Sequence, residues 1–254
     1  MTTISNSIVG IVPTWPAPAT VRSLITTRQG GASRGVYAGF NLGDHVGDDP
    51  AAVAANRAQL AARVGGQPAW LNQVHGTCVI DAAAVVGGAS APPAADASCA
   101  RQPGAICAVM TADCLPVLFC DRAGTVVAAA HAGWRGLLAG VLESTVAAMR
   151  VPGAELLAWL GPAIGPRAFE VGDEVRSAFV AAADDAASAF VPAPGGKWLC
   201  DIYRLARQRL AARGVTQVFG GAECTLSDAT RFYSYRRDGV TGRMAALVWL
   251  EEQT

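Results

Sequence analysis

The sequence lacks the features that would mark a nucleic-acid-binding or membrane protein. It has no run of Lys or Arg, its 20 basic and 20 acidic residues cancel, and charged residues make up only 16% of it. This balance argues against a nucleic-acid footprint or a polybasic membrane patch and fits a small, weakly charged substrate. No uninterrupted apolar run reaches about 18 residues, so no transmembrane helix is expected.

Histidine is scarce, and the cysteines follow no disulfide pattern. The chain has three histidines, His45, His75 and His131, and no His-x-His pair. Its seven cysteines are odd in number and irregularly spaced, which predicts reduced thiols in a cytoplasmic protein. The first twenty residues contain neither a basic segment nor an apolar run of useful length, so no secretory signal is expected.

What the sequence does have is a large apolar fraction, arranged in alternating strand-like and helix-like segments. Hydrophobic residues make up 52% of the 254 residues, ample for a core. Strands are predicted at 21–27, 105–112, 115–121, 125–132, 155–161 and 245–250, and helices at 48–66, 137–149, 171–183 and 201–214. Residues 69–76 and 77–82 resemble paired strands around a turn at Gly76, whereas 28–50 and 184–197 are predicted as long loops.

The connections between these segments set the expected fold class. Several strands are joined by tight turns, which predicts an α+β or layered α/β fold with mixed sheets and without regular βαβ repeats. No break in composition marks a domain boundary, so residues 1–254 are expected to form one domain that includes a lead-in segment at 1–20.

One cysteine and two histidines stand at the ends of different strand-like segments. His75 lies in "QVHG", Cys114 in "TADCLPV" and His131 in "HAGWRG". If these ends converge, the side chains can hold a metal with three protein ligands and an open fourth position, the arrangement of catalytic zinc sites. The spacing is not that of a zinc finger, and two other interpretations stay open. The residues are ordinary core residues, or Cys114 is a nucleophile with His131 as its base.

Asp113 and a set of arginines are further candidates for chemistry. Asp113 precedes Cys114, and on a strand it would point to the opposite face, where it would serve as a turn carboxylate that binds backbone amides. Planar guanidinium groups suit phosphate or carboxylate recognition, although each also fits a surface or ion-pair role. The arginines concerned are Arg28, Arg57, Arg135, Arg236 and Arg237.

Six segments together resemble the YfiH family. Its members have been labelled multicopper polyphenol oxidases, or laccase-domain proteins, and later purine nucleoside phosphorylases. The segments are "TRQGGASRGVYAGFNLGDHVGDDPAAVAANR", "WLNQVHG", "AVMTADCLPVLFCD", "AAAHAGWRGLLAGVLE", "WLGPAIGPRAFEVG" and "FYSYRRDGVTGRMAALVWL". The resemblance runs from about Val21 to Leu250, nearly the whole chain.

The resemblance implies a fold, a metal and a reaction. The implied fold is a single domain with an α-β-β-α sandwich, shared distantly with the catalytic domain of cytotoxic necrotizing factor. The implied cofactor is zinc on His75, Cys114 and His131, with copper able to occupy the same site. The implied activity is phosphorolysis of adenosine, inosine, guanosine and methylthioadenosine, with deamination of adenosine. Its partners are then a purine nucleoside and phosphate.

For that reaction the sequence offers candidate residues by type and motif position. Cys114 and His131 stand at the reacting centre, and Asp113 or Glu170 would transfer protons. The candidates for binding substrate or phosphate are Arg28, Asn41, Arg57, Gln73 and Arg135, the arginines acting with zinc on the phosphate.

Three other functions are alternatives to phosphorolysis: a laccase, an amide hydrolase and a non-catalytic zinc domain. A laccase reduces dioxygen at several copper ions bound mostly by imidazole, and three histidines cannot supply those sites. Some relatives are implicated in editing peptidoglycan precursors, which implies hydrolysis of an amide bond in a UDP-linked muramoyl amino acid by zinc or by Cys114. A non-catalytic, zinc-stabilised domain would unfold on chelation. A homodimer is compatible with the sequence, although no apolar stripe marks an interface.

Overall fold

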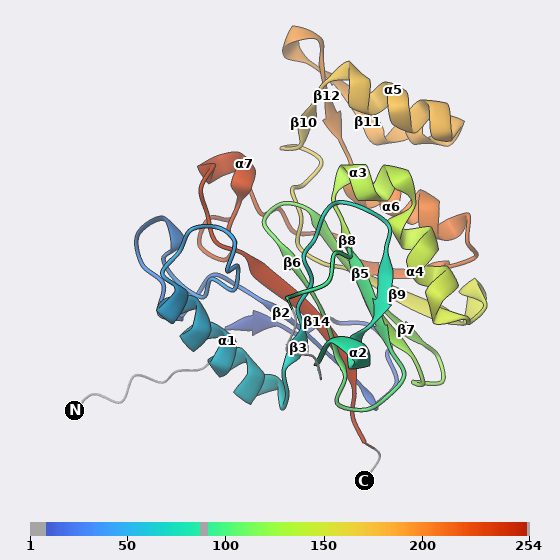
Figure 1. The fold of residues 1–254 in the computed structure, drawn as a ribbon. Helices are drawn as coiled ribbons and strands as arrows, with labels where there is room; N and C mark the ends of the chain where they lie inside the picture. The colour runs from blue at the N-terminus through green and yellow to red at the C-terminus, as the bar shows by residue number, and fades with distance from the viewer. Residues whose placement is uncertain (1–8, 87–90, 253–254) are drawn as a thin grey trace.

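The computed structural model describes residues 9–86 and 91–252, and two β-sheets packed face to face form the centre of this part of the chain (Figure 1). Val109 and Val248 of one sheet and Leu118 and Ala129 of the other belong to the same buried cluster. Because alternate residues of a strand face opposite sides, the central strands of the two sheets bury one set of side chains between the sheets and the other set under helices.

The first sheet has five strands and carries one helix on its outer face. Its strands, in spatial order, are β1 (Gly10–Ile11), β2 (Val21–Thr26), β14 (Met244–Leu250), β6 (Ile106–Thr111) and β3 (Pro68–Ala69). Helix α1 (Pro50–Val64) begins at an Asp49 cap and ends at Gly65, in the left-handed conformation that favours glycine. Its Leu60 and Val64 pack against Ile106 and Leu247 of the sheet.

The second sheet has six strands and is covered by three helices. Its strands, in spatial order, are β13 (Gln217–Gly220), β9 (Leu156–Leu160), β7 (Leu115–Asp121), β8 (Val127–Ala132), β5 (Ala97–Ala100) and β4 (Val79–Asp81). The β13–β9 and β4–β5 pairs are parallel and the others antiparallel. Helices α3 (Trp134–Ala139), α4 (Val141–Met149) and α6 (Ile202–Ala211) pack on its outer face. The layers therefore follow the predicted α-β-β-α order with mixed sheets.

Smaller elements complete the described chain. A three-stranded sheet of β10 (Glu170–Val171), β12 (Lys197–Cys200) and β11 (Phe190–Ala193) projects beside α5 (Asp173–Ala182), at the top of Figure 1. The others are α2 (Ala82–Val86), α7 (Tyr235–Asp238) and the 3-10 helices η1 (Gly35–Tyr37), η2 (Gly153–Glu155), η3 (Asp184–Ala189) and η4 (Pro194–Gly196). None of the described helices is both long and apolar enough to cross a membrane.

Three local predictions are wrong. Residues 69–76 and 77–82 form no hairpin, because β3 joins the five-stranded sheet and β4 the six-stranded one. Residues 184–197 are not a loop: they contain η3 and β11, whose Pro192 is tolerated because β11 is an edge strand. The helix predicted over 137–149 is broken at Gly140, whose φ of 103° ends α3.

Strand β6 is also not the hairpin partner of β7, although only a short turn separates them. The chain passes from the five-stranded to the six-stranded sheet at this turn, and Asp113 has a φ of 91° there. Of the predicted lead-in segment 1–20, residues 1–8 lie outside the described residues, and the remainder includes β1.

Candidate functional site

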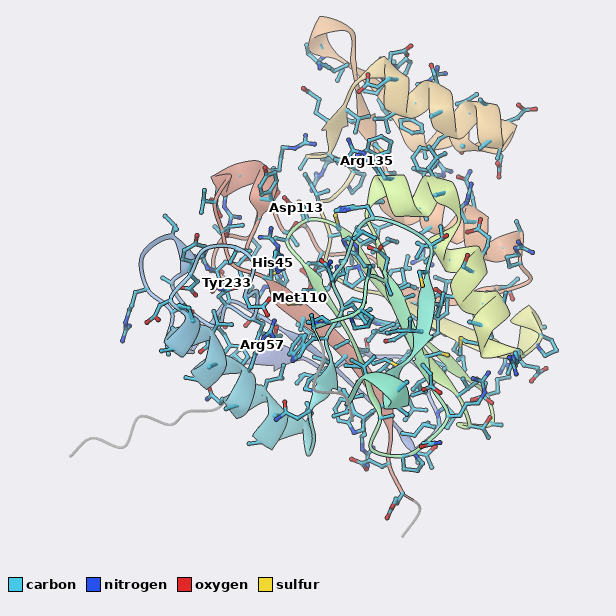
Figure 2. All side chains as sticks on the ribbon, in the orientation of Figure 1. His45, Arg57, Met110, Asp113, Arg135 and Tyr233 are labelled. Carbon is cyan, nitrogen blue, oxygen red and sulfur yellow. The ribbon has the colours of Figure 1, made fainter. Side chains whose placement is uncertain are left out.

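A cavity of about 740 Å³ lies where β6 and β8 end. Figure 2 labels Arg135, Asp113, His45 and Met110 close to one another in this region, and all four side chains line the cavity. The other lining residues are Asp44, Leu71, Asn72, Gln73, His75, Ala91, Pro92, Thr111, Ala112, Cys114, His131, Trp134, Ile164, Phe169, Ile202, Tyr235, Arg236 and Arg243. The cavity therefore combines apolar walls, cationic side chains and the three predicted metal ligands.

The three predicted ligands meet at one point of the cavity. The ligand atoms of His75, Cys114 and His131 all lie within 4.8 Å of one another. Cys114 Sγ is 3.8 Å from His75 Nε2, and the two imidazole rings are 4.8 Å apart, edge to face. One thiolate and two imidazoles form a ligand set that zinc and copper both accept, so this group could hold a metal ion.

Strand register explains how two of the ligands come together. In the β7–β8 hairpin Leu115 pairs with Ala132, which places Cys114 across from Gly133, two residues after His131. A Cβ atom at Gly133 would lie 2.7 Å from His75 Cδ2 and 3.0 Å from Cys114 Sγ. Glycine at this position therefore leaves the space that the three ligand side chains surround.

Asp96 orients His131. Because β5 pairs with β8 so that Ala97 lies opposite Ala130, the preceding residue, Asp96, lies opposite His131. The fully buried Asp96 carboxylate accepts a 2.8 Å hydrogen bond from His131 Nδ1, which leaves Nε2 as the ring atom that can bind a metal. Burial would raise the pKa of Asp96, but the bonds from His131 and the amides of Gly76 and Val74 outweigh it and lower the pKa.

The same carboxylate fixes the segment that carries His75. The backbone N–H groups of Val74, His75 and Gly76 donate to Asp96 at 3.1, 2.9 and 2.6 Å. His75 has a φ of 60°, in the left-handed region that non-glycine residues rarely adopt. Asp96 therefore connects two ligands that arrive from different layers of the fold.

Cys114 and His131 form a thiolate–imidazolium pair in the metal-free protein. Burial raises the pKa of the Cys114 thiol, but the charge and hydrogen bonds of His131 and His75 outweigh it and bring the pKa to about 6. Burial likewise lowers the pKa of His131, but the Cys114 thiolate and Asp96 outweigh it and raise the pKa to about 9. Since the thiolate is the form that binds metals, the site is prepared for a cation.

The remaining predicted residues divide into those that line the cavity and those that do not. Arg135 lines it, with its guanidinium 4.5 Å from the centre of the Trp134 ring. Gln73 also lines it, and its amide exchanges two hydrogen bonds with the backbone of Met110 on β6. Asp113 lines it, but its carboxylate accepts bonds from the Thr225 and Ser234 hydroxyls and from the backbone of Arg236.

Five predicted residues do not line the cavity, and one of them, Arg237, forms an ion pair with Asp238. Arg28 stacks on Tyr233, and Glu170 is exposed on β10. The buried Asn41 amide donates to Asp48 and accepts from the backbone of Arg243, so it organises the loop before α1. Arg57 forms a 3.1 Å ion pair with Asp44, which itself faces the cavity.

Asp96, Arg243 and His45 are site residues that the sequence does not predict. Arg243 lines the cavity, burial lowers its pKa, and its side chain donates to the carbonyl groups of Thr241 and Gly242. His45 is the one histidine that the predicted metal site does not use. Arg243 lies in the segment "FYSYRRDGVTGRMAALVWL", just before the last strand. Asp96, in "AADAS", carries no sequence signal, because its contacts depend on strand register.

The chain is similar to a known protein family and to several of its members. The family model described as multi-copper polyphenol oxidoreductase laccase matches residues 22–251. The chain is 60% identical over 243 residues to a purine nucleoside phosphorylase of Pseudomonas aeruginosa, covering 95% of this chain and 98% of that protein. It is 56% identical over 242 residues to the purine nucleoside phosphorylase YfiH of Escherichia coli, covering 94% of this chain and 98% of that protein.

The fold is also that of a solved structure. The crystal structure of a Neisseria meningitidis protein superposes with a TM-score of 0.93 at 56% sequence identity, covering 96% of this chain and 99% of that one. Sequence and fold therefore agree over nearly the full described length.

Proposed function

The chain belongs to the YfiH family, whose model is described as multi-copper polyphenol oxidoreductase laccase, and from this we propose that it is a zinc-dependent purine nucleoside phosphorylase. The observation that carries the proposal is the cavity, in which a three-ligand metal site, unpaired arginines and apolar walls face the same space. Phosphorolysis needs each of these: a site for phosphate, a surface for the purine, and groups that stabilise charge as the bond to the base breaks.

His75, Cys114 and His131 would hold the zinc ion. Three protein ligands would leave a fourth position free for substrate or water, as in catalytic rather than structural zinc sites. The space at Gly133 and the bond from His131 to Asp96 both fit an ion at this place. Bound there, zinc would supply Lewis acidity to an oxygen atom of phosphate or substrate.

Three arginines support phosphate binding. Arg135, Arg236 and Arg243 line the cavity, and among the ion pairs of the described residues none involves these side chains. Arg236 donates only to the backbone oxygen of Glu170, and Arg243 only to backbone oxygens of its own segment. Guanidinium groups without a carboxylate partner are suited to an oxyanion. Of the predicted phosphate ligands, Arg135 is thus retained, while Arg28 and Arg57 take other roles.

The walls of the cavity suit a purine nucleoside. Trp134 and Phe169 contribute aromatic surface, and Leu71, Met110, Ile164 and Ile202 contribute aliphatic surface. Flat apolar walls with a few polar groups are typical of small-molecule sites. We therefore extend the proposal to adenosine, inosine, guanosine and methylthioadenosine as substrates, and to deamination of adenosine as a second reaction at the same metal.

The family description as a copper oxidase is not the function that the site favours. A laccase needs four copper ions held mainly by imidazole, whereas the ligand group here contains two imidazoles and one thiolate. The third histidine, His45, pairs with Asp44 in the loop before α1. A single copper ion could replace zinc, because copper binds such ligands more tightly, but one ion cannot provide the multi-copper chemistry.

The test is product analysis with protein of measured zinc content. Adenosine and inosine are incubated with and without phosphate, and the products are identified by mass. Free base and ribose 1-phosphate that form only with phosphate support phosphorolysis, and inosine from adenosine without phosphate supports deamination. Cys114→Ala should abolish both. If zinc-loaded wild-type protein forms none of these products, the proposal fails, and the amide bond of a UDP-muramoyl amino acid is the substrate to try next.

The free cysteines bear on where the protein acts in the cell. All seven cysteines are free, and a working Cys114 must stay reduced, so we propose that the enzyme acts in the cytoplasm. Its partners would be the nucleoside and phosphate alone. The predicted homodimer remains a prediction.

A further inference from the structure

The loop before α1 places the His45 imidazole at the cavity, next to the Asp44 carboxylate, which Arg57 holds in place. Asp44 and His45 both line the cavity, and His45 Nδ1 lies 3.5 Å from Asp44 Oδ1. The other oxygen of Asp44, Oδ2, forms an ion pair with Arg57 Nη1 at 3.1 Å. The ring therefore turns Nδ1 toward the carboxylate, which leaves Nε2 free to meet a substrate, as in the acid–base dyads of enzymes.

Arg57 is a fixed support for this pair. Its side chain is 19% exposed, its Nε donates to the Leu42 carbonyl group at 2.9 Å, and its guanidinium lies 4.4 Å from the centre of the Trp70 ring. Trp70 packs against the core under α1. An arginine held on three sides gives Asp44 a defined position, although Asp44 itself is half exposed.

The loop that carries His45 is anchored on both sides. Before it, the buried Asn41 amide accepts from the backbone of Gly43. After it, the Tyr37 hydroxyl donates to the Val46 carbonyl oxygen, and Asn41 donates to Asp48. These bonds join five residues of the loop to one another around one exposed imidazole, and the bond from the Arg243 backbone to Asn41 ties the loop to the segment before β14. Such pre-positioning is typical of catalytic groups rather than of surface histidines.

The other titratable groups of the cavity are already engaged. His75, Cys114 and His131 form the metal site, and the Asp113 carboxylate accepts three hydrogen bonds. The arginines cannot give up a proton at ordinary pH. Among the described residues that line the cavity, the Asp44–His45 pair is left as the imidazole–carboxylate unit outside the metal site, with Tyr235 as a weak phenolic acid.

We propose that His45 is the general acid that protonates the departing purine, with Asp44 and Arg57 as its positioning residues. This inference rests on the proposed phosphorolysis. A phosphate oxygen forms a bond to C1′ of the ribose while the C1′–N9 bond breaks and its electron pair passes to the purine. His45 Nε2 gives its proton to purine N7, so that the base leaves neutral. The ring then regains a proton from water, and the phosphate ester releases one to water.

The test compares two leaving groups. Inosine needs a proton as its base leaves, whereas 7-methylinosine carries a fixed positive charge at N7 and needs none. Zinc-loaded His45→Gln should therefore lose about 10²- to 10⁴-fold in kcat on inosine, the range for removal of a general acid, and keep nearly the wild-type kcat on 7-methylinosine. Asp44→Asn should show the same selectivity with a smaller loss. Retained turnover of 7-methylinosine also shows that each variant is folded.

Tyr37→Phe is the matched control. It removes the hydroxyl that anchors the loop at Val46 and leaves the imidazole in place, so any loss should be equal on both substrates. Equal losses for His45→Gln on both substrates would overturn the inference and leave the phosphorolysis intact, as would an unchanged rate on inosine. If wild-type protein phosphorolyses neither nucleoside, the proposed function falls and this inference falls with it.

Discussion

At the scale of single residues, Asp96 is the side chain on which the metal site depends without belonging to it. Its oxygens accept from His131 Nδ1 and from three consecutive amides around His75. An asparagine has one oxygen instead of two, and its NH₂ group would face the N–H groups of Val74 and Gly76. The change therefore disturbs both ligands at once.

We predict that Asp96→Asn lowers zinc affinity by about 10- to 100-fold, as changes to groups that orient metal ligands do. Affinity is measured by competition with a coloured chelator, and cobalt substitution reports the ligand geometry by its absorption. The matched control is Asp121→Asn, since Asp121 is also buried and accepts three bonds within its own turn, at the end of β7 away from Cys114. That variant should lose stability but keep its zinc affinity. An Asp96→Asn protein with wild-type affinity would contradict this role.

The Cys114–His131 pair predicts how zinc affinity depends on pH. With pKa values of about 6 and about 9, the metal-free site between these limits holds a thiolate and one proton on His131. Zinc must displace that proton, so its affinity should rise about tenfold per pH unit from 6 to 9 and level off above 9. Below 6 the thiol adds a second proton and the dependence becomes steeper. Competition titrations across this range measure the slope, and a flat profile between 6 and 9 would refute the ion-paired state.

At the scale of elements, the turn between β8 and α3 decides whether the site has room for a metal. Gly133→Ala places a methyl group 2.7 Å from His75 and 3.0 Å from the Cys114 sulfur. We predict that this variant folds but loses most of its zinc affinity, as measured by bound zinc after dialysis. Gly76→Ala is the control, because its methyl group would meet Asp96 at an ordinary 3.5 Å. Equal zinc content in the two variants would mean that Gly133 does not limit the site.

Much of the element order could be predicted, and the exceptions have physical causes. The strands near 106–111, 115–121 and 127–132 are continuous apolar runs, and α6 has a clear amphipathic period. The hairpin expected around Gly76 fails because pairing partners depend on which layer a strand joins, and periodicity does not encode this. The break at Gly140 was readable as a glycine within a helical pattern, but only its φ of 103° shows that the helix ends there.

The candidate site divides in the same way. The positions of His75, Cys114 and His131 in the sequence allow a metal site, the resemblance to the YfiH family implies it, and the fold brings the three side chains together. The choice among arginines could not, because residue type does not reveal whether a guanidinium is already occupied. Arg57 is paired with Asp44, whereas Arg243, close to the final strand, faces the cavity.

At the scale of the whole molecule, the extent of the apolar core predicts a fold that does not depend on the metal. Its buried clusters lie between the two sheets and under the helices on each side, and each contains many apolar side chains away from the cavity. We predict that removing zinc with a chelator abolishes turnover but leaves the circular dichroism spectrum and a cooperative thermal transition. The midpoint temperature should fall only by the stabilisation that bound zinc gives the folded state, which its concentration and Kd determine. Collapse of the spectrum on chelation would instead indicate a structural zinc site.

If the proposed function is right, phosphate itself attacks the nucleoside in this cavity, and an isotope-labelling experiment can detect this. Zinc-loaded protein is given inosine and phosphate in which every oxygen is ¹⁸O, and the ribose 1-phosphate is weighed by mass spectrometry, with Cys114→Ala as the control. We expect the wild-type product to retain all the labelled oxygens, because a phosphate oxygen forms the new bond to C1′. Hypoxanthine released with free ribose, or a sugar phosphate that has lost one label, would contradict it.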